Sequence, residues 1–145
     1  MHPPRPSHRT DLATAPRLRI EALRDELVEA HGHDPRSAYA RRFWLPLVGP
    51  SALVAAGTLV TGLERSAEGF EVDVALLGRA LGLPGAAGAN AKIVRTLARL
   101  ARFGLADAHT NGAVPLLRVR TAWPPLTARQ LGRLPAFLAE IHPAA

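Results

Sequence analysis

A segment without any charged residue runs from Phe43 to Leu63, and a segment of this kind is stable only when it is removed from water. It fits either a membrane-spanning helix or a helix in the centre of a protein core. Gly49-Pro50 interrupts it and leaves less than the roughly 20 continuous residues that a bilayer requires. We therefore predict no membrane partner. Because proline suits the first turn of a helix, we predict a core helix over 50–63.

Short elements are expected on both sides of this core helix. Ser37 is placed to cap a helix over 38–44. Residues 69–73 alternate apolar and polar side chains, which is typical of a brief strand. Asp73 then caps a helix over 74–81, which Gly82 would end.

A second helix is predicted from Asn90 to Arg102, and it has two unlike faces. The apolar face is expected to pack on the core and contains Ile93, Leu97, Leu100 and Ala101. The opposite face contains Lys92, Arg95, Thr96, Arg99 and Arg102. It therefore carries four positive charges and no negative one. Such a face is either a solvated helix surface or a binding surface for an anion.

The charge of the chain is concentrated near this helix. The net charge is +6, yet residues 86–121 alone carry one Lys and five Arg against one Asp. Clustered positive charge is typical of proteins that bind polyanions. Lys92 is the only lysine, so a GC-rich bacterial coding bias towards arginine explains part of the excess.

Residues 105–120 have the pattern of a β-hairpin. Asn111-Gly112 supplies the two positive-φ positions of a type I′ turn. In the second strand, Leu117 and Val119 alternate with Arg118 and Arg120, which predicts one apolar and one basic face. Pro115 has no N–H to donate, so this strand is expected at the edge of its sheet.

The two ends of the chain are expected to lie outside this central unit. Residues 1–16 are rich in proline and arginine and predict a disordered basic tail. Residues 17–36 predict an amphipathic helix over 17–30 and a linker. Residues 122–145 predict a C-terminal helix that begins with a Thr127–Gln130 capping box, breaks near Pro135 and packs on the core or on a partner.

Each terminal helix would carry an apolar stripe that fits a homodimer interface. The two candidate stripes are Leu18, Leu23 and Leu27, with Ile20 beside them, and Leu131, Leu134 and Leu138, with Ile141 beyond them.

The order helix, short strand, helix, helix and hairpin resembles the winged helix-turn-helix superfamily. The resemblance covers about residues 45–121 and rests on Leu76-Leu77-Gly78-Arg79-Ala80-Leu81-Gly82-Leu83 followed by Ile93-Val94-Arg95-Thr96-Leu97-Ala98-Arg99-Leu100. It implies a mainly α fold with a small β-hairpin wing, over residues 37–121, with additional N- and C-terminal helices. The connection at 83–89 is longer than the usual turn of this superfamily.

The resemblance also implies a binding site for double-stranded DNA. The second helix of the pair, 90–102, would be the recognition helix, and the wing would be 105–120. The residues expected at DNA are Asn90, Lys92, Arg95, Thr96, Arg99 and Arg102 on the helix, and His109, Asn111, Arg118 and Arg120 in the wing. The first expectation from this resemblance is a nucleoid-associated transcriptional regulator. A cytoplasmic location is expected because no apolar signal sequence opens the chain.

A narrower likeness favours a second interpretation. The stretch Trp44-Leu45-Pro46-Leu47-Val48-Gly49-Pro50-Ser51-Ala52-Leu53 resembles the start of the winged-helix domain of Gram-positive primosomal replication-initiation proteins. That likeness implies self-association as well as DNA contact. Because many winged-helix domains bind protein, the alternative is a winged-helix module that assembles a replication or chromosome-associated complex through its terminal apolar stripes, without direct DNA readout.

Other classes of function find little in the sequence. The chain has no cysteine, which excludes a disulfide scaffold and a thiolate metal site. His31, His33 and Asp34 are too few for a metal centre, so neither a metal nor a cofactor is expected. The nucleophile, phosphate-loop and zinc-protease motifs of common enzymes are absent, so we do not expect an enzyme.

Overall fold

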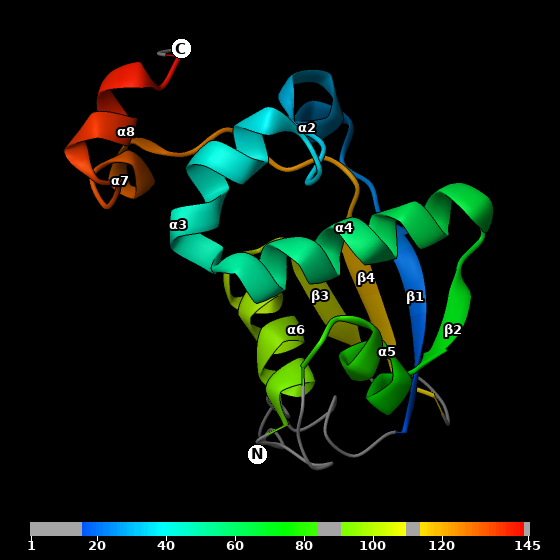
Figure 1. The fold of residues 1–145 in the computed structure, drawn as a ribbon. Helices are drawn as coiled ribbons and strands as arrows, with labels where there is room; N and C mark the ends of the chain where they lie inside the picture. The colour runs from blue at the N-terminus through cyan, green and yellow to red at the C-terminus, as the bar shows by residue number, and fades with distance from the viewer. Residues whose placement is uncertain (1–15, 84–90, 110–113, 144–145) are drawn as a thin grey trace, which may run out of the picture.

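The computed structural model describes residues 16–83, 91–109 and 114–143, and they form a mixed α/β fold (Figure 1). A four-stranded sheet has the order β2-β1-β4-β3, with helices against one of its faces. β1 is antiparallel to β2 and parallel to β4, and β4 is antiparallel to β3. The strands are β1 (Arg17–Leu23), β2 (Phe70–Asp73), β3 (Ala106–His109) and β4 (Leu116–Arg120). The prediction of a mainly α fold with a small hairpin is therefore confirmed only in part: helices are numerous, but the sheet is larger than a hairpin and the fold is mixed α/β.

The predicted amphipathic helix over 17–30 is also wrong. Residues 17–23 form β1, and the side chains of Leu18 and Ile20 are completely buried in it. The helix that follows, α2 (Glu26–His31), is short, and its Leu27 is 81% exposed. The predicted stripe of Leu18, Leu23 and Leu27 does not exist, because the alternation of Leu18, Ile20 and Ala22 fits a strand with a partner on each side.

The predicted core helix is confirmed as α4 (Pro50–Arg65), which begins with Pro50 in its first turn. Figure 1 shows α4 crossing one face of the sheet. Its buried side chains include Leu59, Val60 and Leu63, and of these Leu59 and Leu63 belong to the main hydrophobic core. Within the described part of the chain, no helix combines the length and the apolar character needed to cross a membrane.

The short helix before α4 continues further than predicted. Ser37 Oγ accepts a hydrogen bond from the Ala40 N–H at 3.2 Å, as expected of an N-cap. The chain then forms a π-helical segment, η1 (Ala40–Trp44), and runs through Pro46 into α3 (Leu45–Val48). The wider π turn, in which Leu45 N–H bonds to the Ala40 carbonyl, is the local adjustment that lets the helix pass Pro46.

The predicted helix pair is present as α5 (Val74–Ala80) and α6 (Lys92–Arg102). Asp73 caps α5 by accepting a hydrogen bond from the Leu76 N–H at 2.9 Å, as predicted. The two helices meet closely at Gly78, where an added Cβ would lie 3.2 Å from the Ile93 Cβ. The predicted loop between the helices falls mostly on residues 84–90, outside the described part of the chain.

The hairpin strands are confirmed, but their surroundings differ from the prediction. β4 lies between β1 and β3, so it is an internal strand, and Pro115 precedes it rather than marking a sheet edge. The Pro115 carbonyl accepts a hydrogen bond from the Arg19 N–H at 2.9 Å. His109 pairs with Leu116, whereas a two-residue turn at Asn111-Gly112 would place it opposite Val114. The predicted turn itself lies outside the described residues, as does the predicted tail before Pro16.

The C-terminal segment contains two short helices, α7 (Ala128–Leu131) and α8 (Ala136–Ile141), separated at Pro135 as predicted. The Thr127–Gln130 capping box is confirmed. Leu134 is buried in the core, and Leu131 and Leu138 pack against it. By contrast, Phe137 is 68% exposed and Ile141 is 55% exposed.

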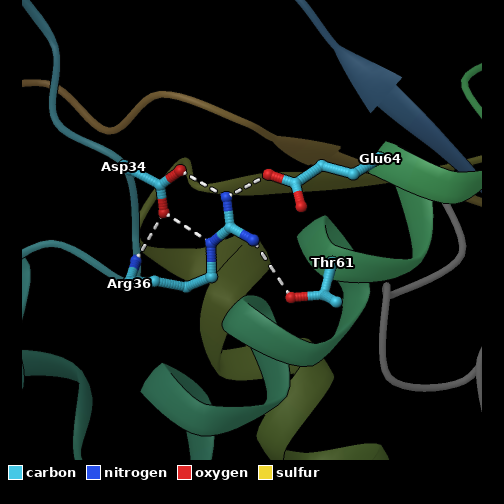
Figure 2. A network of polar contacts seen from close by, with 4 residues as sticks. All are labelled: Asp34, Arg36, Thr61 and Glu64. Carbon is cyan, nitrogen blue, oxygen red and sulfur yellow. Dashed lines mark hydrogen bonds and ion pairs between the residues drawn. The ribbon is translucent and has the colours of Figure 1, made fainter.

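An arginine joins the segment after α2 to α4 (Figure 2). Arg36 donates hydrogen bonds to both carboxylate oxygens of Asp34, to the Glu64 carboxylate and to Thr61 Oγ1. The hydrogen bonds to Arg36 are the main cause of a lowered pKa at Asp34. They lower the pKa of Glu64 in the same way. Nearby, His33 stacks on Tyr39 with ring centroids 3.7 Å apart, and burial lowers its pKa.

Candidate nucleic-acid interface

Helix α6 presents a single narrow row of cations to solvent. Lys92, Arg95, Arg99 and Arg102 follow one another at spacings of three and four residues, and all four are exposed. Most of the other helix residues, among them Val94 and Ala98, are buried. The row therefore lies along the part of the helix that its neighbours leave uncovered.

The prediction that Thr96 faces outward with these cations is wrong, because its side chain is only 8% exposed. Helical spacing alone placed it on the polar face, but α6 is covered over more of its circumference than a surface helix. Ala101, which was predicted in the core, is only half-buried. Thr96 is thus largely buried and lines a depression beside the helix together with the cations.

That depression is a groove of about 530 Å³ between α6 and the start of α4. The α4 side consists of the α3–α4 junction and the first residues of α4, and Leu83 contributes from the end of the α5 region. None of the lining residues is acidic. They are Val48, Gly49, Pro50, Ser51, Ala52, Leu83, Lys92, Arg95, Thr96, Arg99 and Arg102.

One of the four groove cations also has a structural contact. Arg99 donates a hydrogen bond to the Leu47 carbonyl at 2.9 Å, which joins α6 to the end of α3. Its guanidinium carbon lies 5.8 Å from the centre of the Phe103 ring. Across the residues that the structure describes, Lys92, Arg95 and Arg102 make no hydrogen bond or ion pair through their side chains. Within this part of the structure their charges are not compensated.

The arginines of the sheet differ from those of α6 because they have acidic partners. Arg118 Nε and Nη2 each lie 3.0 Å from an oxygen of Asp107, its neighbour across the β3–β4 pair. Arg19 pairs with Glu21 at 3.0 Å. Arginine is frequent in this chain. Among the described residues, the arginines of the sheet are paired with carboxylates, and those of α6 are not.

The wing residues predicted at DNA are largely engaged within the hairpin. His109 Nε2 lies 3.0 Å from the Asp107 carboxylate and 3.0 Å from Arg118. Arg120 donates a hydrogen bond of 2.7 Å to the Gly104 carbonyl and lies 3.9 Å from the Asp25 carboxylate. Asn111, like Asn90 on the helix side, lies outside the described residues.

The structure therefore divides the predicted site into two groups. Five of the predicted helix residues line one groove, and His109 and Arg118 form a separate cluster around Asp107. The groove also contains Gly49, Pro50 and Ser51, which were not among the residues predicted at the binding site. The sequence does contain an indication of their role: a helix that begins with Gly49-Pro50 has no side-chain cap, so its first backbone N–H groups lack an acceptor within the helix.

No protein-family model matches the sequence, and no curated protein matches it. Among solved structures, the fold is similar to the crystal structure of the primosome protein DnaB (residues 1–300) from Geobacillus stearothermophilus, with a TM-score of 0.52. The two sequences are 21% identical over 86% of this chain. The chain spans less than half of the matched structure, 45% of its length. At this level of identity, the similarity is one of fold.

Proposed function

We propose that this chain is a winged-helix protein that binds double-stranded DNA through α6. The succession α4, β2, α5, α6, β3 and β4 supports this assignment, since it has the element order of the winged helix-turn-helix superfamily. In this proposal α6 is the recognition helix and the β3–β4 hairpin is the wing.

One observation carries the proposal: three cations of α6 are exposed, lie in one groove and lack acidic partners in the described structure. Lys92, Arg95 and Arg102 would each neutralise a phosphate of the DNA backbone. Neutralising three phosphates gives a slope of about −2.7 for the logarithm of affinity against the logarithm of salt concentration. Affinity should then fall by roughly 40-fold between ~50 and ~200 mM salt.

The biological role that we attach to this activity is transcriptional regulation in a bacterial cytoplasm, at the nucleoid. Phosphate contacts from this cation row would supply most of the affinity.

Fluorescence anisotropy with labelled duplex DNA at two salt concentrations tests the proposal. The double variant R95E/R102E should lose binding, because it places two negative charges where phosphates approach. The matched control is R129E/R133E, which makes the same charge change at two exposed arginines in and after α7. The control should bind as the wild type does. If the wild type binds no duplex even at low salt, the proposed function is wrong.

A second candidate function is a protein–protein assembly module, such as a component of a replication complex. Phe137 and Ile141 of α8 favour it, because both are more than half exposed despite their large apolar side chains. The fold similarity to a primosome protein points in the same direction. The variant F137S/I141S distinguishes the two functions by light scattering and anisotropy: the assembly function predicts loss of self-association or partner binding with DNA affinity unchanged.

A further inference from the structure

The N-terminus of α4 opens into the same groove as the cations of α6, and its first backbone donors are unsatisfied. Gly49 occupies the N-cap position and provides no side-chain hydrogen bond. Pro50 has no N–H, and the first N–H within the usual helical pattern is that of Leu53, which bonds to the Gly49 carbonyl at 3.1 Å. The N–H groups of Ser51 and Ala52 therefore remain without an acceptor among the described residues.

A second polar group in this groove lacks a partner. Thr96 of α6 is 92% buried and lines the groove, and within the described structure its hydroxyl makes no hydrogen bond. In the described part of the chain, the fully buried side-chain atoms without a partner do not include the Thr96 hydroxyl, so this hydroxyl stays open to the groove that Thr96 lines. The hydroxyl and the helix donors belong to different elements and line the same space.

The charged side chains of the groove favour a negatively charged ligand. Lys92 and Arg95 lie on the same helix as Thr96, and no carboxylate is among the lining residues. Two backbone N–H groups at the start of a long helix, a hydroxyl and two cations are together the donor set that a phosphate group uses. The positive end of the α4 dipole adds to the attraction.

We propose that the groove between the start of α4 and α6 is a phosphate-binding site, formed by Ser51, Ala52, Lys92, Arg95 and Thr96. This inference deepens the proposed function and rests on it for its biological ligand. The bound group is one phosphodiester of the DNA backbone, held between two helices. α6 then contacts DNA with its cation row on a backbone strand, and the binding is largely independent of base sequence.

Two variants test the site without removing its cations. Ser51→Glu places a carboxylate in the first turn of α4, where acidic residues favour the helix, so the fold is retained while the anion is repelled. Ala128→Glu is the matched control, because it makes the same charge change in the first turn of the exposed helix α7. Thr96→Val removes only the hydroxyl and should weaken phosphate binding about tenfold.

The measurement is an amide NMR titration of the whole chain with inorganic phosphate and, separately, with duplex DNA. The proposal predicts saturable shifts of the Ser51 and Ala52 amides with both ligands, lost in Ser51→Glu and retained in Ala128→Glu. If DNA shifts α6 signals but leaves the Ser51 and Ala52 amides unchanged, the phosphate site is wrong and the DNA-binding function stands. If phosphate binds in the groove and DNA does not bind, the site is upheld for a free phosphate compound and the DNA-binding function fails. If phosphate produces no saturable shift, the site is overturned.

Discussion

The guanidinium of Arg118 in β4 donates two hydrogen bonds to the carboxylate of Asp107 in β3, each 3.0 Å long. The two residues are directly opposite each other in the antiparallel pair, so the ion pair crosses the hairpin. A bidentate contact of this kind holds the guanidinium in place and cancels its charge locally. The hairpin therefore offers DNA less positive charge than its sequence suggests.

We expect the double variant Asp107→Ala/Arg118→Ala to change DNA affinity by less than twofold, because it removes both charges of a compensated pair. The variant should lower the free energy of unfolding by about 0.5–1 kcal/mol, as is typical for a partly exposed ion pair. Anisotropy and urea denaturation measure the two effects. Arg95→Ala is the comparison, since Arg95 is an exposed and unpaired arginine in the groove. Equal losses of affinity in the two variants would contradict the division of the site.

The salt dependence of DNA binding should respond to single groove cations. Lys92→Ala and Arg102→Ala should each reduce the slope of log affinity against log salt by about 1, since each removes one phosphate contact. Arg99→Ala should in addition destabilise the fold, because the Leu47 carbonyl loses its donor. Anisotropy at four or more salt concentrations gives the slopes. A slope unchanged in both variants would exclude these side chains from the interface.

Two leucines that the sequence placed on one stripe should differ sharply in their effect on stability. Leu18→Ala should lower the free energy of unfolding by roughly 2–5 kcal/mol, because its side chain is completely buried in β1. Leu27→Ala should change it by less than about 0.5 kcal/mol, since Leu27 is 81% exposed. Urea denaturation of both variants checks this. Similar losses of unfolding free energy in the two variants would support the predicted helix over 17–30 and contradict the strand β1.

The hydroxyl of Tyr39 should contribute to the attachment of the C-terminal segment. It accepts a hydrogen bond from the Leu126 N–H at 2.8 Å and lies 2.7 Å from His142 Nε2. Tyr39→Phe leaves a buried N–H without an acceptor and should cost about 1–3 kcal/mol of unfolding free energy. Thr58→Val removes an exposed hydroxyl from α4 and serves as the control, with an expected change below about 0.5 kcal/mol. Hydrogen exchange at the Leu126 amide should accelerate in Tyr39→Phe alone.

The Arg36 network should make stability depend on pH in the acid range. The folded-state pKa values of Asp34 and Glu64 are lowered by their hydrogen bonds to Arg36, so both groups stabilise the fold above their unfolded pKa of about 4. This stabilisation is lost as the pH falls through the folded values. The difference in unfolding free energy between the wild type and Arg36→Met should therefore shrink from pH ~6 to pH ~3. A difference that stays constant over this range would show that the network does not act through these carboxylates.

The helices and hairpin strands of the central unit were predictable from the sequence because their signals are local. Asp73 caps α5 by accepting a hydrogen bond from the N–H of Leu76, only three residues further on, and Pro50 begins α4. The capping box at Thr127 is equally local. In each case the residues that specify the element are the ones that form it.

The errors concern features that depend on distant parts of the chain. β1 is a strand because β2 and β4 lie on either side of it, and the spacing of Leu18, Leu23 and Leu27 also fitted a helix. Thr96 is buried because α6 is covered by its neighbours, which its own sequence does not reveal. The groove at the candidate site joins α4 to α6, so no single segment predicts it.

The parallel pairing of β1 with β4 has a consequence for how the chain acquires its structure. Arg19 lies opposite Leu116, so the first and last strands along the chain are neighbours in the sheet. Contacts between residues this far apart in sequence slow folding, because the long intervening loop must close before the contact is gained. During synthesis, β1 leaves the ribosome before β4 and remains without its parallel partner until β4 has been made. In that interval its unpaired edge is open to chaperones and to misassociation.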